Sequence, residues 1–291
     1  MRIGKIVLCG LAFALLSHGS VPQTDSTAPW QTLEPGMDLK VFTAGKPGPA
    51  GDARISVLRI DPETWDLEFV GMSLNGGKTT RTAREWCKAH RLSAGINAGM
   101  FATDYKTHVG YLGFRGHVNS SHVNSYKSVA AFDPRGGRLP RFRIFDLDEP
   151  EVTVKTILRD YASAVQNLRL IKRPGSNVWP QQAKKWSPAV LGEDAAGRIL
   201  FIFSRSPFSM YDLNRELLAA GIDLVAAQHL EGGPEAQLYV KAGPVELEMF
   251  GSFETSFKED DRNQQPWPIP NVLGVRRRPP AKPAAERPAP R

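Results

Sequence analysis

The sequence predicts an α+β fold, a single domain with an extensive mixed or antiparallel sheet and few helices. Short runs of alternating or β-branched residues recur along the 291-residue chain, and turn-forming residues separate them. Only two segments show the apolar spacing of an amphipathic helix. The 23 prolines and 26 glycines favour a loop-rich sheet protein, and 41% hydrophobic residues suffice for a buried core. An all-helical bundle is therefore not expected.

The first 19 residues have the pattern of a secretory signal peptide. Arg2 and Lys5 form a short basic region, and residues 6–16 are an apolar run of 11 residues. Such a run is too short to cross a bilayer, which takes about 20 residues. We therefore expect residues 1–19 to be removed on export, with no transmembrane segment later in the chain. The mature protein is expected in the periplasm or outside the cell.

The formal charge of +7 is concentrated at the two ends of the chain. Residues 276–291 contribute +5 and residues 1–19 contribute +2, so the stretch between them is neutral. A neutral folded part does not support nucleic-acid binding. Residues 276–291 are low-complexity Pro, Ala and Arg, and we expect a disordered basic tail that can touch anionic surfaces. Residues 20–37 are polar and contain proline, which predicts a flexible lead-in to a folded domain over 38–275.

Strand-like runs fill most of that expected domain. They combine period-2 alternation with β-branched and aromatic residues, and turns at 75–77, 134–137 and 173–175 separate some of them. The predicted strands are 39–42, 54–60, 66–70, 109–114, 128–132, 151–158, 164–171, 199–203 and 247–250.

The two predicted helices cover residues 82–91 and 210–220. The first opens with a capping box formed by Thr82 and Glu85, and the second follows Ser209 as its N-cap. Apolar residues recur on one face of the second helix, which indicates that this face packs on a sheet.

Each predicted helix leads into a short strand that ends near a glycine-bearing polar motif. The motifs are Asn97-Ala98-Gly99-Met100-Phe101 and Glu231-Gly232-Gly233-Pro234-Glu235. Polar groups at strand ends beside glycine turns are common places for sites. A carboxylate followed by two glycines lets a ligand approach the backbone and aims N–H groups at an anion. The alternative is a surface turn with two solvated glutamates.

Cysteine and histidine give a weaker basis for chemistry. After signal removal Cys87 is the only cysteine, so no intramolecular disulfide can form, and we interpret it as a buried structural thiol. His108, His117 and His122 lie close together in the sequence, which raises the hypothesis of a metal-dependent hydrolase. Their spacings of 9 and 5 residues fix no ligand pair on a helix, and hydrogen-bonding loop histidines are the favoured interpretation.

Several motifs occur in a fixed order that covers nearly the whole expected domain. They are Asn97–Phe101, Val109-Gly110, residues 166–171, residues 191–194, residues 229–234 with Leu238-Tyr239, and residues 269–275. In this order they resemble the landmarks of the phosphodiester glycosidase family, exported domains related to the mannose-6-phosphate uncovering enzyme. The combination of Asn-Ala-Gly-Met-Phe with a distant acidic-Gly-Gly motif is fairly specific.

The resemblance implies hydrolysis of a sugar–phosphate diester at the anomeric carbon, with release of the sugar and a phosphomonoester left behind. We expect no cofactor and no metal. A phosphate leaves readily, but a carboxylate is still needed to activate water or stabilise oxocarbenium charge. The resemblance assigns this role to Glu231, with Asn97 and Asn167 orienting the substrate and His108 as a proton-transfer partner. Substrate contacts are expected from Gly99, Gln166, Arg205, Gly232, Gly233 and Glu235.

Two positions depart from the family's usual Asp-Gly-Gly followed by serines. Glu231 replaces the aspartate, and Glu235 stands near the serine position. Two hypotheses follow. The first is an exported glycosidase acting on a sugar-1-phosphodiester or related glycan linkage in envelope or exopolysaccharide material. The alternative is a non-catalytic glycan-binding protein that keeps the cleft, for which replacing Glu231 with glutamine leaves binding unchanged.

Overall fold

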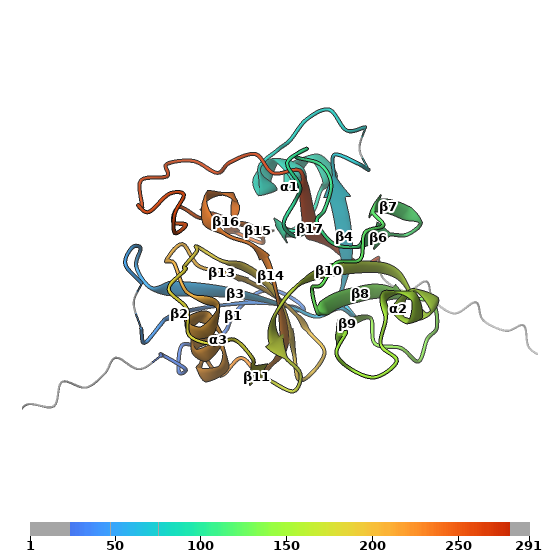
Figure 1. Cartoon of the computed structure of the whole chain (residues 1–291), viewed down its shortest axis with the longest axis horizontal. Helices are drawn as coiled ribbons and strands as arrows, with labels where there is room; N and C mark the ends of the chain where they lie inside the picture. Colours follow the sequence, from blue (N-terminus) through green and yellow to red (C-terminus); the bar gives the residue numbers. More distant parts are fainter. Residues whose placement is uncertain (1–23, 47, 75, 280–291) are drawn as a thin grey trace, which may run out of the picture.

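Two antiparallel β-sheets and three α-helices make up the described part of this computed structural model, residues 24–46, 48–74 and 76–279 (Figure 1). The predicted α+β class is confirmed, and every strand pairing among the described residues is antiparallel. The predicted signal peptide and most of the basic tail lie outside the described residues.

The large sheet has twelve strands, and its central strand β14 (Leu224–Glu231) lies between β12 and β10. The main path runs β1 (Gln31–Glu34), β2 (Met37–Thr43), β3 (Arg54–Ile60), β13 (Ile199–Phe203), β12 (Ala189–Asp194), β14, β10 (Tyr161–Lys172), β6 (Leu112–Phe114) and β7 (His117–Ser120). Three further strands join it, with β11 (Ser176–Asn177) and β8 (Ser128–Pro134) on β10, and β9 (Phe142–Asp146) on β8.

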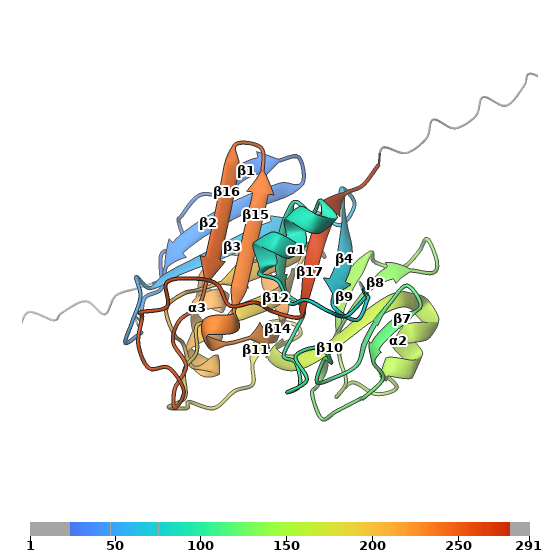
Figure 2. The same cartoon turned by 90° about the horizontal axis from the view of Figure 1, so that it is seen from above.

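The small sheet has five strands and packs over the large one. Its order is β16 (Val245–Phe250), β15 (Gln237–Ala242), β5 (Ala94–Asn97), β17 (Asn271–Arg277) and β4 (Trp65–Gly71). Figure 2 shows this sheet with α1 (Ala83–His90) lying on its outer side.

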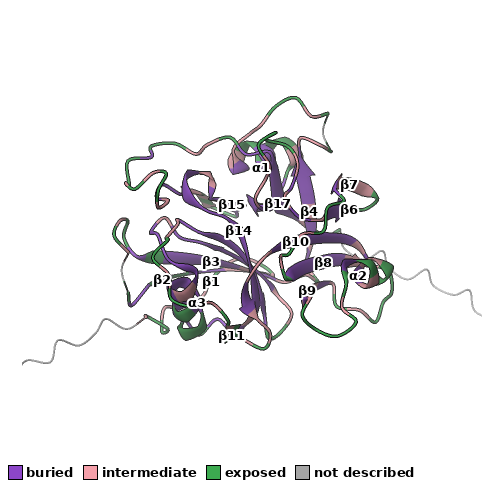
Figure 3. Cartoon of the chain, viewed as in Figure 1, coloured by how far each residue is buried: buried purple, intermediate pink, exposed green. Residues whose placement is uncertain are grey.

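The main hydrophobic core lies between the two sheets (Figure 3). Leu58 and Phe201 of the large sheet and Leu273 of the small sheet are fully buried in it. Their strand neighbours Val57 and Ile202 point the other way and pack against α3 (Met210–Ala219), as the period of two requires. α1 covers the small sheet, and α2 (Val154–Asp160) packs on β8 and β10.

Both predicted helices are confirmed with their caps. Thr82 and Glu85 form the capping box of α1, and Ser209 accepts the Asp212 N–H at the start of α3. Cys87 is buried in the contact between α1 and the small sheet, and burial raises the pKa of its thiol. No described helix is long and apolar enough to cross a membrane.

The prediction of a strand over 151–158 is wrong, because most of this segment forms α2, a helix that the sequence analysis did not predict. Thr153 caps it, and the Thr156 side chain returns to the Thr153 N–H at 2.9 Å. Val154 and Ile157, three residues apart, are its buried positions. The β-branched residues suggested a strand, but the cap and the three-residue spacing decide the local structure.

Both ends of the folded part extend beyond the predicted limits. The lead-in expected to be flexible contains β1, which pairs with β2, and Trp30, whose ring stacks under the Arg59 guanidinium at 3.8 Å. At the other end β17 continues to Arg277, and Arg278 pairs with Asp66. The predicted strand over 109–114 is confirmed only from Leu112 onward.

Candidate active site

The two glycine motifs meet where the chain crosses from the large sheet to the small one. β14 ends at Glu231, and the 3-10 turn η1 (Gly233–Glu235) leads directly into β15. β5 lies beside β15 and ends at Asn97. The Asn97 side chain donates to the Glu235 carbonyl at 2.9 Å and accepts from the Gln237 N–H at 2.7 Å. Asn97, expected to orient substrate, therefore uses both polar ends to hold the Glu231 turn.

A pocket with a volume of about 210 Å³ opens beside the end of β14. Its polar side chains are Glu231, Glu254, His229 and Gln182. The rest of its wall is mostly aromatic and apolar, formed by Met100, Tyr126, Leu168, Trp179, Trp186 and Met210. Apolar walls with a few polar groups are the usual composition of a small-molecule site, and they suit a sugar ring with its apolar face and hydroxyl edge.

Glu231 is a buried carboxyl in this pocket. It is 9% exposed, and its Oε1 accepts the Gly232 N–H at 3.1 Å. Burial raises the pKa of Glu231 to about 8, and the nearby charges of Glu235 and Glu254 act in the same direction. Burial also raises the pKa of Glu235 and the pKa of Glu254. This raised pKa favours the protonated carboxyl, which is the form that a general acid requires.

Glu254, which no sequence motif indicated, lies against the glycine pair. It comes from the loop after β16, and its backbone forms an isolated bridge with Trp186. A Cβ built on Gly233 (φ +66°) would lie 2.7 Å from Glu254 Oε2, and one built on Gly232 would lie 2.9 Å from Trp186 Cδ1. The glycines thus make room for a carboxyl and an indole. The Gly232 N–H, expected to face an anion, donates to Glu231 instead.

Gln166, expected to contact phosphate, is fully buried and uses its whole amide within the protein. Its nitrogen donates to the Asn124 and Tyr126 carbonyls at 3.1 and 2.7 Å. Its oxygen accepts the N–H groups of Tyr111 and Asn124, both at 3.2 Å. Gln166 therefore anchors the loop that carries Tyr126 to the pocket wall.

Gly99, His108 and Asn167 form a buried cluster that does not line the pocket. A Cβ on Gly99 would lie 2.2 Å from Asn167 Oδ1 and 2.3 Å from His108 Cε1, so only glycine fits. His108 Nε2 hydrogen-bonds to the Gln166 carbonyl at 2.7 Å, and burial lowers the pKa of His108 to about 4. Asn167 donates to the Ala98 carbonyl at 3.1 Å. These contacts hold the segment after β5 against β10.

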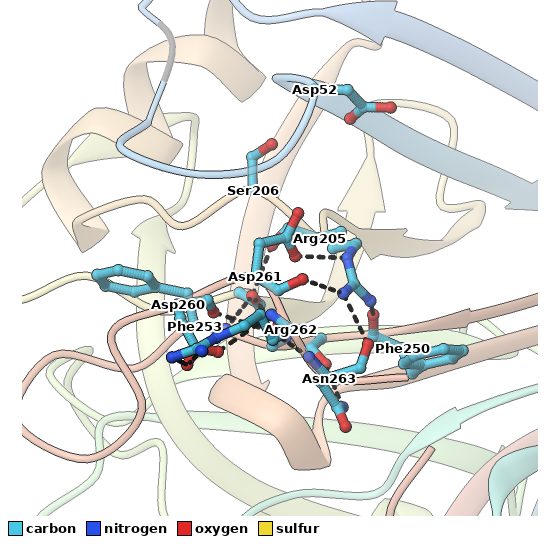
Figure 4. Close-up of polar contacts among 12 residues, drawn as sticks. Asp52, Arg205, Ser206, Phe250, Phe253, Asp260, Asp261, Arg262 and Asn263 are labelled. Carbon is cyan, nitrogen blue, oxygen red and sulfur yellow. Dashed lines mark hydrogen bonds and ion pairs between the residues drawn. The ribbon is translucent and has the colours of Figure 1, made fainter. Parts of the chain in front are cut away.

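Arg205, expected to contact phosphate, lies just after β13 and points toward the loop after β16 (Figure 4). Its Nε pairs with Asp261 Oδ1 at 2.6 Å, and its terminal nitrogens donate to the carbonyls of Phe250, Asp261 and Asn263. The structure does not bring Arg205 to the Glu231 pocket. Within the described part of the chain, no lysine or arginine lines that pocket. Arg205 instead fixes the loop that carries Glu254.

The three histidines of the metal hypothesis have separate partners. His108 is bound to Gln166, His117 Nε2 shares a hydrogen bond of 2.9 Å with Ser73 Oγ, and His122 is exposed. In the described ranges, no three His, Cys, Asp or Glu side chains are placed to hold a metal ion.

A larger hollow of about 470 Å³ lies elsewhere, lined by arginines and carboxylates. Arg115 pairs there with Asp133 at 2.9 Å, and Arg278 pairs with Asp66. Because none of the sequence-predicted site residues lines this hollow, we place the candidate chemistry in the Glu231 pocket.

His229 is a pocket residue that sequence reasoning missed, although a signal was present. It precedes Glu231 by two residues on β14, so both side chains lie on one face of the sheet. His229 is 4% exposed, and burial lowers its pKa to about 4. Trp179 and Trp186 come from the segment between β11 and β12, and Glu254 comes from the loop after β16. They had no comparable signal, because both segments are distant from Glu231 in the sequence.

Comparison with known proteins gives one family and a shared fold. The family model for phosphodiester glycosidase matches residues 90–276. The catalytic domain of zebrafish N-acetylglucosamine-1-phosphodiester alpha-N-acetylglucosaminidase, auto-inhibited by its pro-peptide, aligns with a TM-score of 0.60 and 11% identity over 88% of each chain. A hypothetical protein from Synechocystis aligns with a TM-score of 0.52 and 11% identity, over 86% of this chain and 64% of that one. No curated protein matches in the sequence search. At 11% identity, these structural similarities show only that the fold is shared.

Proposed function

The chain belongs to the phosphodiester glycosidase family, a family of hydrolases, and on this premise we propose that it is an exported glycosidase. Its reaction would be hydrolysis of a sugar-1-phosphodiester or a related glycan linkage in envelope or exopolysaccharide material. The observation that carries the proposal is Glu231, a buried carboxyl that opens on a pocket walled by Trp179 and Trp186.

Each part of the pocket has a role in this proposal. The flat faces of Trp179, Trp186 and Tyr126 supply apolar surface for a sugar ring, and the Glu231 carboxyl faces the bond to be broken. Asn97 and Gln166 hold the Glu231 turn and the Tyr126 loop in place. Such support from buried hydrogen bonds keeps a catalytic carboxyl in position, where an error of about 1 Å can reduce the rate roughly 100-fold.

The test is hydrolysis of phosphate-linked and aryl glycosides by the wild type and by Glu231→Gln. We expect turnover by the wild type and a loss of about 100- to 10,000-fold in the variant. Glu151→Gln is the matched control, because Glu151 is exposed in the turn before α2. Circular dichroism would check that both variants fold.

An absence of turnover would distinguish the glycan-binding hypothesis from the glycosidase hypothesis. If no substrate is hydrolysed, and if Glu231→Gln binds oligosaccharide as tightly as the wild type, the glycosidase proposal is wrong. The chain would then be a glycan-binding protein.

A further inference from the structure

The hollow of about 470 Å³ beside the start of β4 is lined by more positive than negative side chains. Its charged lining residues are four arginines and two aspartates, namely Arg115, Arg135, Arg141, Arg278, Asp66 and Asp133. Arginine stays protonated at any working pH, so the lining has an excess of two positive charges. A concave surface of one sign concentrates ions of the other sign. We call this place the arginine hollow.

Two of the four arginines already have carboxylate partners in the lining. Arg115 binds Asp133 through two nitrogens, at 3.0 and 2.9 Å, and Glu68 adds a contact at 3.1 Å. Arg278 pairs with Asp66. These pairs use both aspartates of the lining, so the excess charge comes from the other two arginines.

Arg135 and Arg141 have donors to offer a ligand. The exposed Arg135 side chain has no hydrogen bond or ion pair among the described residues. Arg141 pairs through Nε with Glu63 at 2.6 Å, but Glu63 is 67% exposed and outside the lining, so water weakens this pair. The fork of a guanidinium group matches the two oxygens of a carboxylate or a phosphate. The two free arginines therefore favour an acidic ligand.

The floor of the arginine hollow is apolar. Trp65, Leu67, Phe132 and Ile199 form it, and all four are almost fully buried. A concave place with an apolar floor and a few polar groups has the composition of a ligand site, and its volume lies within the usual range of roughly 300–1,000 Å³. A sugar ring with an acid group presents both an apolar face and an anion, so an acidic sugar unit matches both features.

The arginine hollow and the Glu231 pocket lie at opposite ends of the same strands. On β10, Ala162 lines the hollow and Leu168 lines the pocket. β8 shows the same arrangement, because Tyr126 of the pocket precedes it and Pro134 of the hollow ends it. Six residues of strand extend about 20 Å. The hollow is therefore too far away to hold the phosphate of the bond being cleaved, and only a polymer would reach both places.

We propose that the arginine hollow binds an acidic unit of a glycan polymer, with Arg135 and Arg141 holding its carboxylate or phosphate group. This binding site goes beyond the proposed glycosidase function, which belongs to the Glu231 pocket. A polymer held at both places stays bound between cleavages, because the second contact becomes intramolecular once the first is made. A small substrate cannot span the distance and gains nothing from the hollow.

The first experiment measures binding of three hexasaccharides to the full mature chain by isothermal titration calorimetry. The ligands are an α-1,4-linked galactose hexamer, the same hexamer with 6-phosphates, and the galacturonic acid hexamer. They share length and linkage, so the two acidic ligands show whether the hollow prefers phosphate or carboxylate. We expect one acidic hexamer at least to bind about 10-fold more tightly than the neutral hexamer, and its affinity to fall as salt screens the charges.

Two double variants locate that binding. The first combines Arg135→Gln with Arg141→Gln and removes the two free cations. The control combines Arg54→Gln with Arg215→Gln, two exposed residues outside the lining of the hollow. Both double variants change the net charge equally and keep the basic tail, so general attraction of anions cancels between them. Circular dichroism checks that both fold.

The first double variant should weaken binding of the acidic hexamer by about 10- to 100-fold, and the control should bind as the wild type does. Equal losses in the two double variants would overturn the proposal. So would a neutral hexamer that binds as tightly as the acidic ones, or a wild type that binds none of the three.

A turnover measurement separates the hollow from the glycosidase function. For the wild type and both double variants, kcat/KM is measured for an acidic polymer and for an aryl glycoside. The ratio of the polymer value to the aryl value should fall about 10-fold in the first double variant and stay the same in the control. An unchanged ratio in the first double variant would contradict the role in holding the polymer. If the wild type hydrolyses no substrate, the proposed function fails, whereas the calorimetry still decides whether the hollow binds acidic glycan.

Discussion

Replacing Glu231 with glutamine tests the electrostatics of the pocket without any substrate. The side chain is buried and hydrogen-bonded through Oε1 to the Gly232 N–H, and burial raises its pKa from 4.5 to about 8. Glutamine has the same shape and keeps an oxygen for Gly232, but it never ionises. The variant should therefore fold as the wild type does and lose only the dependence of stability on this one titration.

The sign and size of the effect follow from proton linkage. Between pH 4.5 and 8, unfolded Glu231 has released its proton while folded Glu231 retains it, so the free energy of unfolding falls as pH rises. For each pH unit over which the folded and unfolded states differ by one bound proton, the free energy of unfolding changes by about 1.4 kcal/mol. Between pH 5 and pH 8, the free energy of unfolding of the wild type should therefore fall by roughly 4 kcal/mol relative to that of Glu231→Gln.

The assay is urea unfolding of both proteins at pH 5, 6, 7, 8 and 9, followed by circular dichroism. Taking the difference between variant and wild type at each pH cancels the titrating groups that do not interact with Glu231, and leaves its own titration together with that of the coupled Glu235 and Glu254. We expect the difference to grow in favour of the variant up to about pH 8 and then to level off. A difference that stays flat across the series would show that Glu231 ionises normally, and the general-acid role would be refuted.

Three further predictions test the supports of the site. Gly233→Ala should destabilise the fold by about 1–3 kcal/mol and reduce turnover. Gly233 has a φ of +66°, and the new Cβ would lie 2.7 Å from Glu254 Oε2. Urea unfolding measures the change in stability, and steady-state kinetics measure the change in turnover. Arg205→Ala should destabilise the protein by about 2 kcal/mol, because it removes the Asp261 pair and the hydrogen bonds to the carbonyls of Phe250, Asp261 and Asn263. It should slow neutral and phosphate-linked substrates by the same factor, and slowing of the phosphate-linked ones alone would contradict our placement of Arg205. Thr153→Ala should reduce stability by about 1 kcal/mol through loss of the α2 cap, without changing kcat/KM.

Local signals predicted a large share of the fold and one part of the site. Thr82 and Ser209 are caps whose effect lies within one helical turn, and residues 54–60 and 199–203 alternate or stay apolar over a strand's length, so these elements were found with their bounds or nearly so. Glu231 was singled out because a carboxyl directly before two glycines is an unusual local pattern, and the structure places it in the wall of the pocket at the end of β14. α2 was missed where β-branched composition and a capping box disagreed.

What the tertiary structure alone decided is which side chains surround Glu231. Glu254 and Trp186 come from separate loops, and they reach the pocket because Gly232 and Gly233 leave space for them. Arg205 was grouped with phosphate ligands by its charge, yet the carbonyls of the loop after β16 surround it. The sequence by itself determined periodicity, caps and the position of one carboxyl, because those depend on neighbours along the chain. Burial, partners and protonation depend on neighbours in space, and folding alone brings these together.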